Sequence, residues 1–168
     1  MPHRWKPNVT VAAIIERDGR FLLVEEQAAD GLRLNNPAGH LDPGETLVQG
    51  CTRETLEETA HLFRPTALVG VYLSRQPKPA VVATQTQTIT YLRFAFCGEL
   101  GEFQSHLRLD HGIVRTLWLS ADEIRASAPR HRSPVLLQCV EDYLAGARYP
   151  MDLLHSDLDG PLQGPARE

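Results

Sequence analysis

The chain has 168 residues, about the length of one domain, which is enough to bury a hydrophobic core without disulfide bonds. Hydrophobic residues make up 42% and charged residues 23%, and the net charge of -4 argues against a nucleic-acid partner because it gives no broad attraction for a polyanion. The three cysteines form no Cys-x-x-Cys pair, and no apolar run is long enough for a secretory signal or a bilayer span, so we expect a cytoplasmic protein with no disulfide framework and no membrane partner.

Strand and turn signals dominate the N-terminal part. Residues 9–16 and 20–26 are two β-rich runs, and the Asp18-Gly19 pair between them is typical of a hairpin turn. We therefore predict a hairpin that forms part of a central sheet. Residues 27–33 are predicted to be a loop, and Pro37 fixes the backbone that follows it.

The middle of the chain is predicted to contain one helix and two strands. Thr46, with Gln49 three residues later, has the pattern of a capping box and marks the start of the helix. We expect strands at residues 67–73 and 88–100, and the second is apolar on both faces, which indicates a central position. The polar segment 74–87 between them is long for a hairpin connection, so we place it at the rim of a pocket.

The C-terminal part adds one strand, at residues 113–119, and two helices. Ser120 opens a short helix with a capping box, and Ser133 is the predicted N-cap of a last helix that covers the sheet opposite the first helix. This order of elements predicts the α/β class, with a three-layer α/β/α sandwich around a mixed central sheet. We expect one domain over residues 1–155 and a loosely ordered tail over residues 156–168.

Three carboxylates lie close together on the predicted first helix. Glu54, Glu57 and Glu58 are spaced i, i+3 and i+4, so they fall within one arc of the helix surface. Because like charges repel, something must offset them, and a hard divalent cation with oxygen ligands does so most simply. The pattern therefore favours a Mg²⁺ site, in which Mn²⁺ can substitute. The alternative is a solvated acidic helix face.

The segment around these carboxylates resembles the Nudix box. That pattern is Gly, five residues, Glu, seven residues, then Arg-Glu-apolar-any-Glu-Glu-any-Gly-apolar, and its glycine and charged positions are matched by Gly39, Glu45, Arg53, Glu54, Glu57 and Glu58. Three softer positions depart from it, namely Thr55, Ala60 and His61. The resemblance implies the Nudix fold and a metal-dependent hydrolase that cleaves a phosphoanhydride by attack of water at phosphorus.

Shorter stretches are similar to one bacterial branch of this family, the NudJ-type phosphatases. They include Lys6-Pro7, 37–41, 92–94, 132–134 and 148–150. This resemblance implies a small-molecule pyrophosphate or nucleotide substrate, such as hydroxymethylpyrimidine pyrophosphate, thiamine pyrophosphate or nucleoside di- and triphosphates. A nucleotide pyrophosphohydrolase that releases pyrophosphate or cleaves a nucleoside diphosphate joined to another group stays open, as does a non-catalytic ligand sensor of the same fold. The sequence does not decide between a monomer and a homodimer.

The resemblance assigns roles along the box. Glu54, Glu57 and Glu58 hold the cation, together with the backbone carbonyl of Ala38, while Glu45 orients this face or holds a second ion. Arg53 is expected to orient Glu54 or Glu57 as part of the catalytic set, or else to form an ordinary pair on the helix surface.

Two charged residues outside the box are candidates for the same site. Arg93 lies on a strand that looks buried, where an unpaired charge is costly, so it should meet either a carboxylate or the substrate phosphate. Asp110 precedes the strand at 113–119 and is our candidate for metal binding or water activation, with loop capping as the alternative.

Four further residues are candidates for substrate binding, each with a structural alternative. His40 could contact phosphate, or be a hydrogen-bonded structural histidine. Asn35 could contact the substrate, or serve the backbone turn. Tyr72 and Tyr91 could stack on a substrate ring, although core packing is the more common role of aromatic residues at strand spacing.

Overall fold

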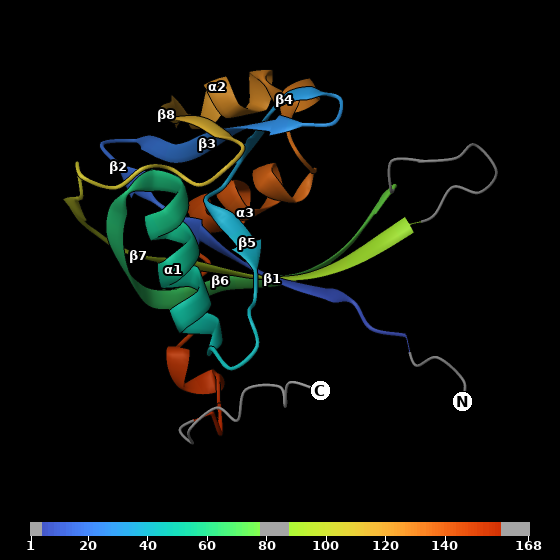
Figure 1. The fold of residues 1–168 in the computed structure, drawn as a ribbon, viewed down its shortest axis with the longest axis vertical. Helices are drawn as coiled ribbons and strands as arrows, with labels where there is room; N and C mark the ends of the chain where they lie inside the picture. Colours follow the sequence, from blue (N-terminus) through green and yellow to red (C-terminus); the bar gives the residue numbers. More distant parts are fainter. Residues whose placement is uncertain (1–4, 78–87, 159–168) are drawn as a thin grey trace, which may run out of the picture.

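The computed structural model describes residues 5–77 and 88–158 (Figure 1). Within these ranges the strands form two sheets. The first has the order β5-β1-β7-β6, and its strands are β1 (Asn8–Ile14), β5 (Ala38–His40), β6 (His61–Pro77) and β7 (Thr88–Phe103). The second has the order β2-β3-β4 with β8 on β3, and its strands are β2 (Glu16–Arg17), β3 (Arg20–Ala28), β4 (Gly31–Asn35) and β8 (Ile113–Ser120). The helices are α1 (Leu47–Thr59), α2 (Ala121–Ala126) and α3 (Val135–Leu144), with short 3-10 turns η1 (Ala128–Arg130) and η2 (Met151–Leu153).

The first sheet is mixed and is covered by helices on both faces (Figure 1). β1 runs parallel to β7, whereas the pairs β1–β5 and β6–β7 are antiparallel. Successive side chains of β1 point to opposite faces. Val11 and Ala13 pack in one cluster with Cys51 of α1, and Ala12 and Ile14 pack in another with residues of α3. The predicted α/β/α sandwich and the placement of the last helix opposite the first are therefore confirmed.

The turn of the predicted hairpin is confirmed, but its two strand runs do not join the same sheet. Asp18 and Gly19 both have positive φ angles, 54° and 76°, and join β2 to β3. β1, however, leaves this hairpin and pairs with β5 and β7 in the other sheet. The reason is that residues 11–14 are buried on both faces, which requires a strand neighbour on each edge and a helix on each side.

Two expected loops contain strands. In residues 27–33, β3 continues to Ala28 and pairs with β4, and Gly31 with φ of 114° makes the turn possible. β6 is much longer than the expected strand at 67–73, because it pairs with β7 from His61 to Pro77. Residues that interrupt the regular pairing are accommodated by shifts of the strand register. Residues 74–77 are thus strand, and the rest of the expected rim loop, residues 78–87, lies outside the described residues.

The helix caps agree with the sequence at two of three positions. Thr46 and Gln49 form the predicted capping box of α1, and Ser120 forms one at α2. Ser133 is not the N-cap of α3, because the helix begins at Val135 and the Ser133 hydroxyl makes no hydrogen bond to it.

Within the described parts of the chain, no helix combines the length and apolar composition that a membrane span needs.

Candidate active site

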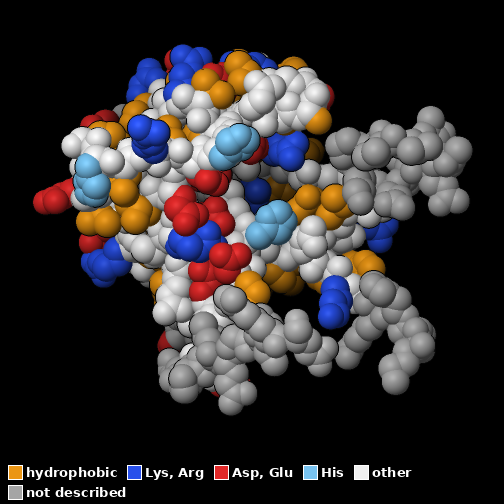
Figure 2. All heavy atoms as spheres, viewed as in Figure 1, with side chains coloured by type: hydrophobic (Ala, Val, Ile, Leu, Met, Phe, Trp, Pro, Cys, Tyr) orange, Lys and Arg blue, Asp and Glu red, His pale blue; other side chains and the backbone are white. Residues whose placement is uncertain are grey.

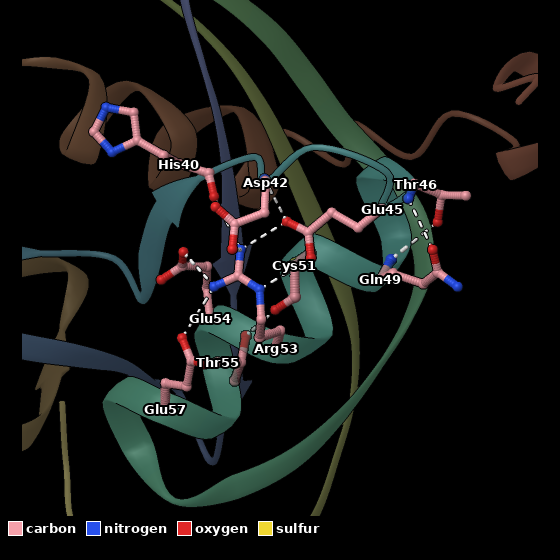
Figure 3. A network of polar contacts seen from close by, with 10 residues as sticks. All are labelled: His40, Asp42, Glu45, Thr46, Gln49, Cys51, Arg53, Glu54, Thr55 and Glu57. Carbon is pink, nitrogen blue, oxygen red and sulfur yellow. Dashed lines mark hydrogen bonds and ion pairs between the residues drawn. The ribbon is translucent and has the colours of Figure 1, made fainter. Parts of the chain in front are cut away.

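Arg53 organises the polar face of α1 by holding three carboxylates at once (Figure 3). Its Nη1 donates to Glu54 over 2.8 Å and to Glu57 over 3.0 Å. Its Nε and Nη2 donate to Glu45 over 2.9 and 2.6 Å, and Nη2 also donates to the carbonyl of His40 over 3.0 Å. A planar guanidinium offers five fixed N–H donors, which lets one side chain tie the helix to the loop before it.

Glu45 is held by Arg53 and by the backbone of the loop before α1. Its Oε1 accepts the backbone N–H of Asp42 over 2.7 Å, and the Arg53 hydrogen bonds hold the pKa of this carboxyl below its usual range. Gly50 allows this approach, since a Cβ there would lie 2.7 Å from the same oxygen. Both carboxylate oxygens of Glu45 therefore already accept hydrogen bonds from Arg53.

Glu58 and Glu54 lie deeper. Glu58 is buried and accepts the backbone N–H of Ala38 over 2.8 Å. Burial, together with the carboxylates nearby, raises the pKa of Glu58 to about 8 and also raises the pKa of Glu54. The Glu54 carboxylate lies against Gly39, where an added Cβ would come within 2.1 Å of its carboxyl carbon. A glycine at position 39 is what gives this carboxylate its place.

Asp110 joins the same acidic group from another part of the chain. Its backbone N–H donates to the carbonyl of Glu57 over 2.8 Å, which brings the residue to the end of α1. Its charge contributes to the raised pKa values of both Glu54 and Glu58. Figure 2 shows acidic side chains gathered around a basic one on this face.

The donor set of this acidic group fits a hard divalent cation. It consists of carboxylate oxygens that repel one another in a partly buried place, and a cation would offset that repulsion. Among the described residues, no three His, Cys, Asp or Glu side chains converge on one point in the present arrangement. The reason is that Arg53 and the Ala38 N–H already hold oxygens of Glu54, Glu57 and Glu58, so a bound cation would exchange some of these contacts for its own.

A cavity of about 310 Å³ opens between this acidic group and the sheet. On the acidic side it is lined by Ala38, Gly39, Asp42, Glu54, Glu58 and Asp110. A second set of lining residues, which we call the polar side, consists of Thr10, Glu26, Asn35, Arg93 and Ser133, and the charge of Glu26 contributes to the raised pKa of Glu58. His40, Ser74, Gln76, Tyr91 and Arg132 complete the lining, and the ring centroids of His40 and Tyr91 lie 6.1 Å apart.

Eight of the twelve residues singled out from the sequence line this cavity. Glu45, Arg53 and Glu57 do not line it, although Arg53 joins the other two to Glu54. Tyr72 lies away from it. Its hydroxyl donates to Asp142 of α3 over 2.8 Å, and its ring packs against the hydrophobic core. It lines a separate cavity with Leu68 and Arg148. The expectation that Tyr72 stacks on a substrate is therefore corrected to the core-packing alternative.

Comparison with known proteins identifies the family of the chain. The family model of the NUDIX domain matches residues 4–139. The chain belongs to the Nudix family. It is 34% identical over 158 residues to phosphatase NudJ of Escherichia coli K12, which covers 94% of this chain and 96% of that protein. It is also 49% identical to a NUDIX hydrolase from Nitrosomonas europaea, whose structure covers 92% of this chain and 100% of its own with a TM-score of 0.81.

A further solved structure shows the fold alone. The UDP-X diphosphatase is 20% identical, with a TM-score of 0.65 over 88% of this chain and 68% of that chain. The protein is thus a Nudix hydrolase, an enzyme acting on phosphoanhydride bonds of small phosphorus-containing compounds, in a family that generally uses divalent metal ions.

Several cavity residues of this Nudix hydrolase were not singled out from the sequence, among them Thr10, Glu26, Arg132 and Ser133. Thr10 stands within the mostly apolar strand β1, and Glu26 lies near the end of β3. Ser133 was assigned to a helix cap, and Arg132, whose Nε lies 3.3 Å from Glu26 Oε1, was noted only as part of a short similarity. A polar residue inside an apolar strand was the available signal at Thr10, because such a residue needs a partner when buried.

Proposed function

We propose that this Nudix hydrolase is a phosphatase that removes orthophosphate from small pyrophosphorylated compounds, using Mg²⁺ or, in its place, Mn²⁺. The candidate substrates are hydroxymethylpyrimidine pyrophosphate, thiamine pyrophosphate and nucleoside di- and triphosphates. Similarity to phosphatase NudJ along 94% of the chain supports this proposal. The cavity volume of about 310 Å³ also supports it, because this is near the lower end of the range for ligand pockets and suits a small substrate.

The acidic group would hold the cation. Glu54, Glu57 and Glu58 would supply carboxylate oxygens, and Ala38 would supply its backbone carbonyl. When bound, a divalent cation neutralises charge that develops on the phosphoryl oxygens and makes a water more acidic. Glu45 would take a second ion only if its hydrogen bonds to Arg53 opened, so we assign it to support instead.

Other side chains of the protein would orient the carboxylates, accept the proton of the attacking water and contact the substrate. Arg53 would orient Glu54 and Glu57 through the two hydrogen bonds from its Nη1. Asp110 faces the cavity next to these carboxylates and would either complete the cation site or accept the proton of the attacking water. His40 and Arg93, which line the same cavity, would contact the substrate.

One observation carries the proposal: a single cavity joins an acidic side built from the Nudix box to a polar side that includes a buried arginine. A diphosphate ester has the same two parts, a charged phosphate end that needs a cation and an organic end that needs a polar or flat surface. The geometry therefore suits hydrolysis of the anhydride at one end of the cavity while the other end holds the remainder.

The test is a panel of these compounds and ADP-ribose, incubated with the protein and Mg²⁺, with product analysis. We expect release of orthophosphate. Pyrophosphate or a nucleoside monophosphate formed in one step would instead assign a nucleotide pyrophosphohydrolase. No turnover of any member, with the same result in Mn²⁺, would overturn the phosphatase proposal and favour the non-catalytic ligand sensor.

A further inference from the structure

The polar side of the cavity contains an unusual concentration of buried groups without hydrogen-bond partners. Among the described residues, six buried side-chain oxygen or nitrogen atoms have no such partner, and five of them belong to residues that line this cavity. The five are Thr10 Oγ1, Glu26 Oε1, Asn35 Oδ1, Arg93 Nη1 and Ser133 Oγ. Because buried polar groups in native proteins are normally paired, a cluster of this kind indicates a place that a polar ligand completes.

Four of these side chains are fixed firmly in the fold. Thr10, Asn35, Arg93 and Ser133 are 6%, 6%, 9% and 4% exposed. Thr10 of β1 and Arg93 of β7 are direct partners in the parallel pair, so their side chains share one face of the sheet. Asn35 ends β4, and Ser133 lies just before α3. Their positions are therefore set by strand pairing and by a helix start, and they need little rearrangement to receive a ligand.

The chemistry of these groups distinguishes between two kinds of ligand. Arg93 can only donate hydrogen bonds, Asn35 Oδ1 and an ionised Glu26 can only accept them, and the hydroxyls of Thr10 and Ser133 can do both. Phosphate oxygens can only accept unless they are protonated, so a phosphate here would leave the acceptors without partners. An amino-substituted nitrogen heterocycle carries a ring nitrogen that accepts and an amino group that donates, and it can pair with both kinds of group.

The surroundings agree with a flat ring. Tyr91 lines the same cavity and is inclined to the nearby His40 ring, which gives aromatic surface at the rim. Glu26 is not isolated on this side, since Arg132 lies 3.3 Å from its Oε1, but that contact does not form a hydrogen bond. The acceptor therefore remains available to a ligand amino group.

We propose that Thr10, Asn35, Arg93 and Ser133, with Glu26, form a specificity subsite that binds the organic part of the substrate, an amino-substituted nitrogen heterocycle such as an aminopyrimidine. The phosphate groups then lie at the acidic side of the cavity. This inference rests on the proposed phosphatase function and adds to it the residues that choose the substrate.

Calorimetry with free hydroxymethylpyrimidine, in its natural amino-substituted form and with EDTA present, tests the subsite without any hydrolysis. We expect the wild-type protein to bind this ring and to bind the analogue without the amino group about tenfold more weakly, because one hydrogen bond is lost. Thr10→Val and Ser133→Ala should each weaken ring binding about tenfold as well. Neither variant should lower the melting temperature, since neither hydroxyl has a partner within the protein to lose.

Ser127→Ala is the matched control. The Ser127 hydroxyl donates to the carbonyl of Ile124 over 2.9 Å and lies outside the cavity, so its removal should leave ring binding as it is. In kinetics with Mg²⁺, Ser133→Ala should lower kcat/KM for hydroxymethylpyrimidine pyrophosphate at least about tenfold more than kcat/KM for inorganic tripolyphosphate, which has no ring.

The outcomes separate this inference from the proposed function. If the ring does not bind, or if inorganic phosphate binds and Thr10→Val and Ser133→Ala weaken phosphate binding instead, the subsite is a phosphate site and the inference is overturned even where the substrate panel shows turnover. Ring binding that depends on these residues, with no turnover of any panel member, supports the inference and overturns the proposed phosphatase.

Discussion

Two arginine–carboxylate clusters in the described residues have opposite compositions. In the first, one arginine on α1, Arg53, holds Glu45, Glu54 and Glu57. In the second, one carboxylate on β3, Glu25, is held by Arg115 of β8 and by Arg130. The first cluster has more negative than positive charge and borders the cavity, whereas the second has more positive charge and lies outside the cavity lining.

From this difference we infer a functional role for the first cluster and a structural role for the second. The Glu25 side chain is 2% exposed, and both of its oxygens are paired, so nothing in this cluster needs a further ligand. It joins β3 to β8 directly, because Glu25 and Arg115 are partners in the strand pair. In the acid-rich cluster, one guanidinium cannot neutralise three carboxylates, and Glu58 and Asp110 add to the excess. That excess is what a divalent cation would compensate.

The largest expected effect is on catalysis, in Glu57→Gln. Removing one charged oxygen ligand should lower kcat by at least about 100-fold, or about 2.7 kcal/mol in the activation barrier. The melting temperature should change little, because the Glu57 side chain is 45% exposed. Steady-state kinetics at saturating Mg²⁺ and a thermal melt measure both quantities. Unchanged activity would mean that the ligands are assigned to the wrong residues.

The next effect is on stability, in Glu25→Gln. This change keeps the shape of the side chain but weakens two charge-assisted hydrogen bonds, so the free energy of unfolding should fall by about 2 kcal/mol. Denaturant unfolding measures the loss. Because Glu25 is not part of the cavity lining, kcat should stay within about twofold of wild type, as expected for a change outside the site. A large loss of kcat without a loss of stability would remove the distinction between the clusters.

A smaller effect is expected for Arg53→Lys, which keeps the charge but loses the fork of donors. An ammonium group cannot reproduce the simultaneous contacts to Glu45, Glu54 and Glu57, so kcat should fall about tenfold and the Mg²⁺ concentration needed for half-maximal activity should rise. Arg125→Lys is the matched control, since Arg125 pairs with Glu141 and Asp122 away from the cavity. Equal effects of the two variants on the Mg²⁺ requirement would argue against a positioning role.

The smallest effect is a pH dependence of stability that belongs to the second cluster. Hydrogen bonds from Arg115, with the charges of Arg115 and Arg130, hold the pKa of Glu25 below its ordinary value of 4.5. Its contribution to stability is therefore complete above about pH 4.5 and is lost as the pH falls through the lower pKa of the folded state. The stability difference between wild type and Glu25→Gln should shrink over this acidic window. A difference that grows on acidification would contradict the assignment.

Features built from residues close together in the sequence could be predicted, whereas contacts between distant segments could not. Helical periodicity is local, so the placement of Glu54 and Glu58 at one cavity and the capping box at Thr46 could be predicted from spacing alone. The pairing of β1 with β7 is a long-range choice, and nothing in the β-rich runs shows which sheet each run joins. For this reason the neighbourhood of Thr10 and Arg93 was not predicted.

Tyr72 shows a second limit. It is the strand partner of Arg93, and the two side chains share one face of the sheet. The alternation of side chains alone therefore predicts substrate contact equally well for both residues. Only the position of α3 separates them, because Asp142 of that helix takes the Tyr72 hydroxyl while Arg93 stays at the cavity. Long β6 escaped prediction for a related reason, since its irregular residues are tolerated by register shifts that depend on β7.

The parallel pairing of β1 with β7 also governs the order in which the molecule can be assembled during its synthesis. β1 leaves the ribosome before α1 and β6, and its parallel neighbour β7 is made only after both. Until then, an apolar strand that is destined to be buried on both faces has an open edge, which is the kind of surface that binds chaperones or other nascent chains. A chain released before residue 88 would contain the residues of the box helix but would lack β7, which completes the central sheet, and the cavity residues Tyr91, Arg93, Asp110, Arg132 and Ser133.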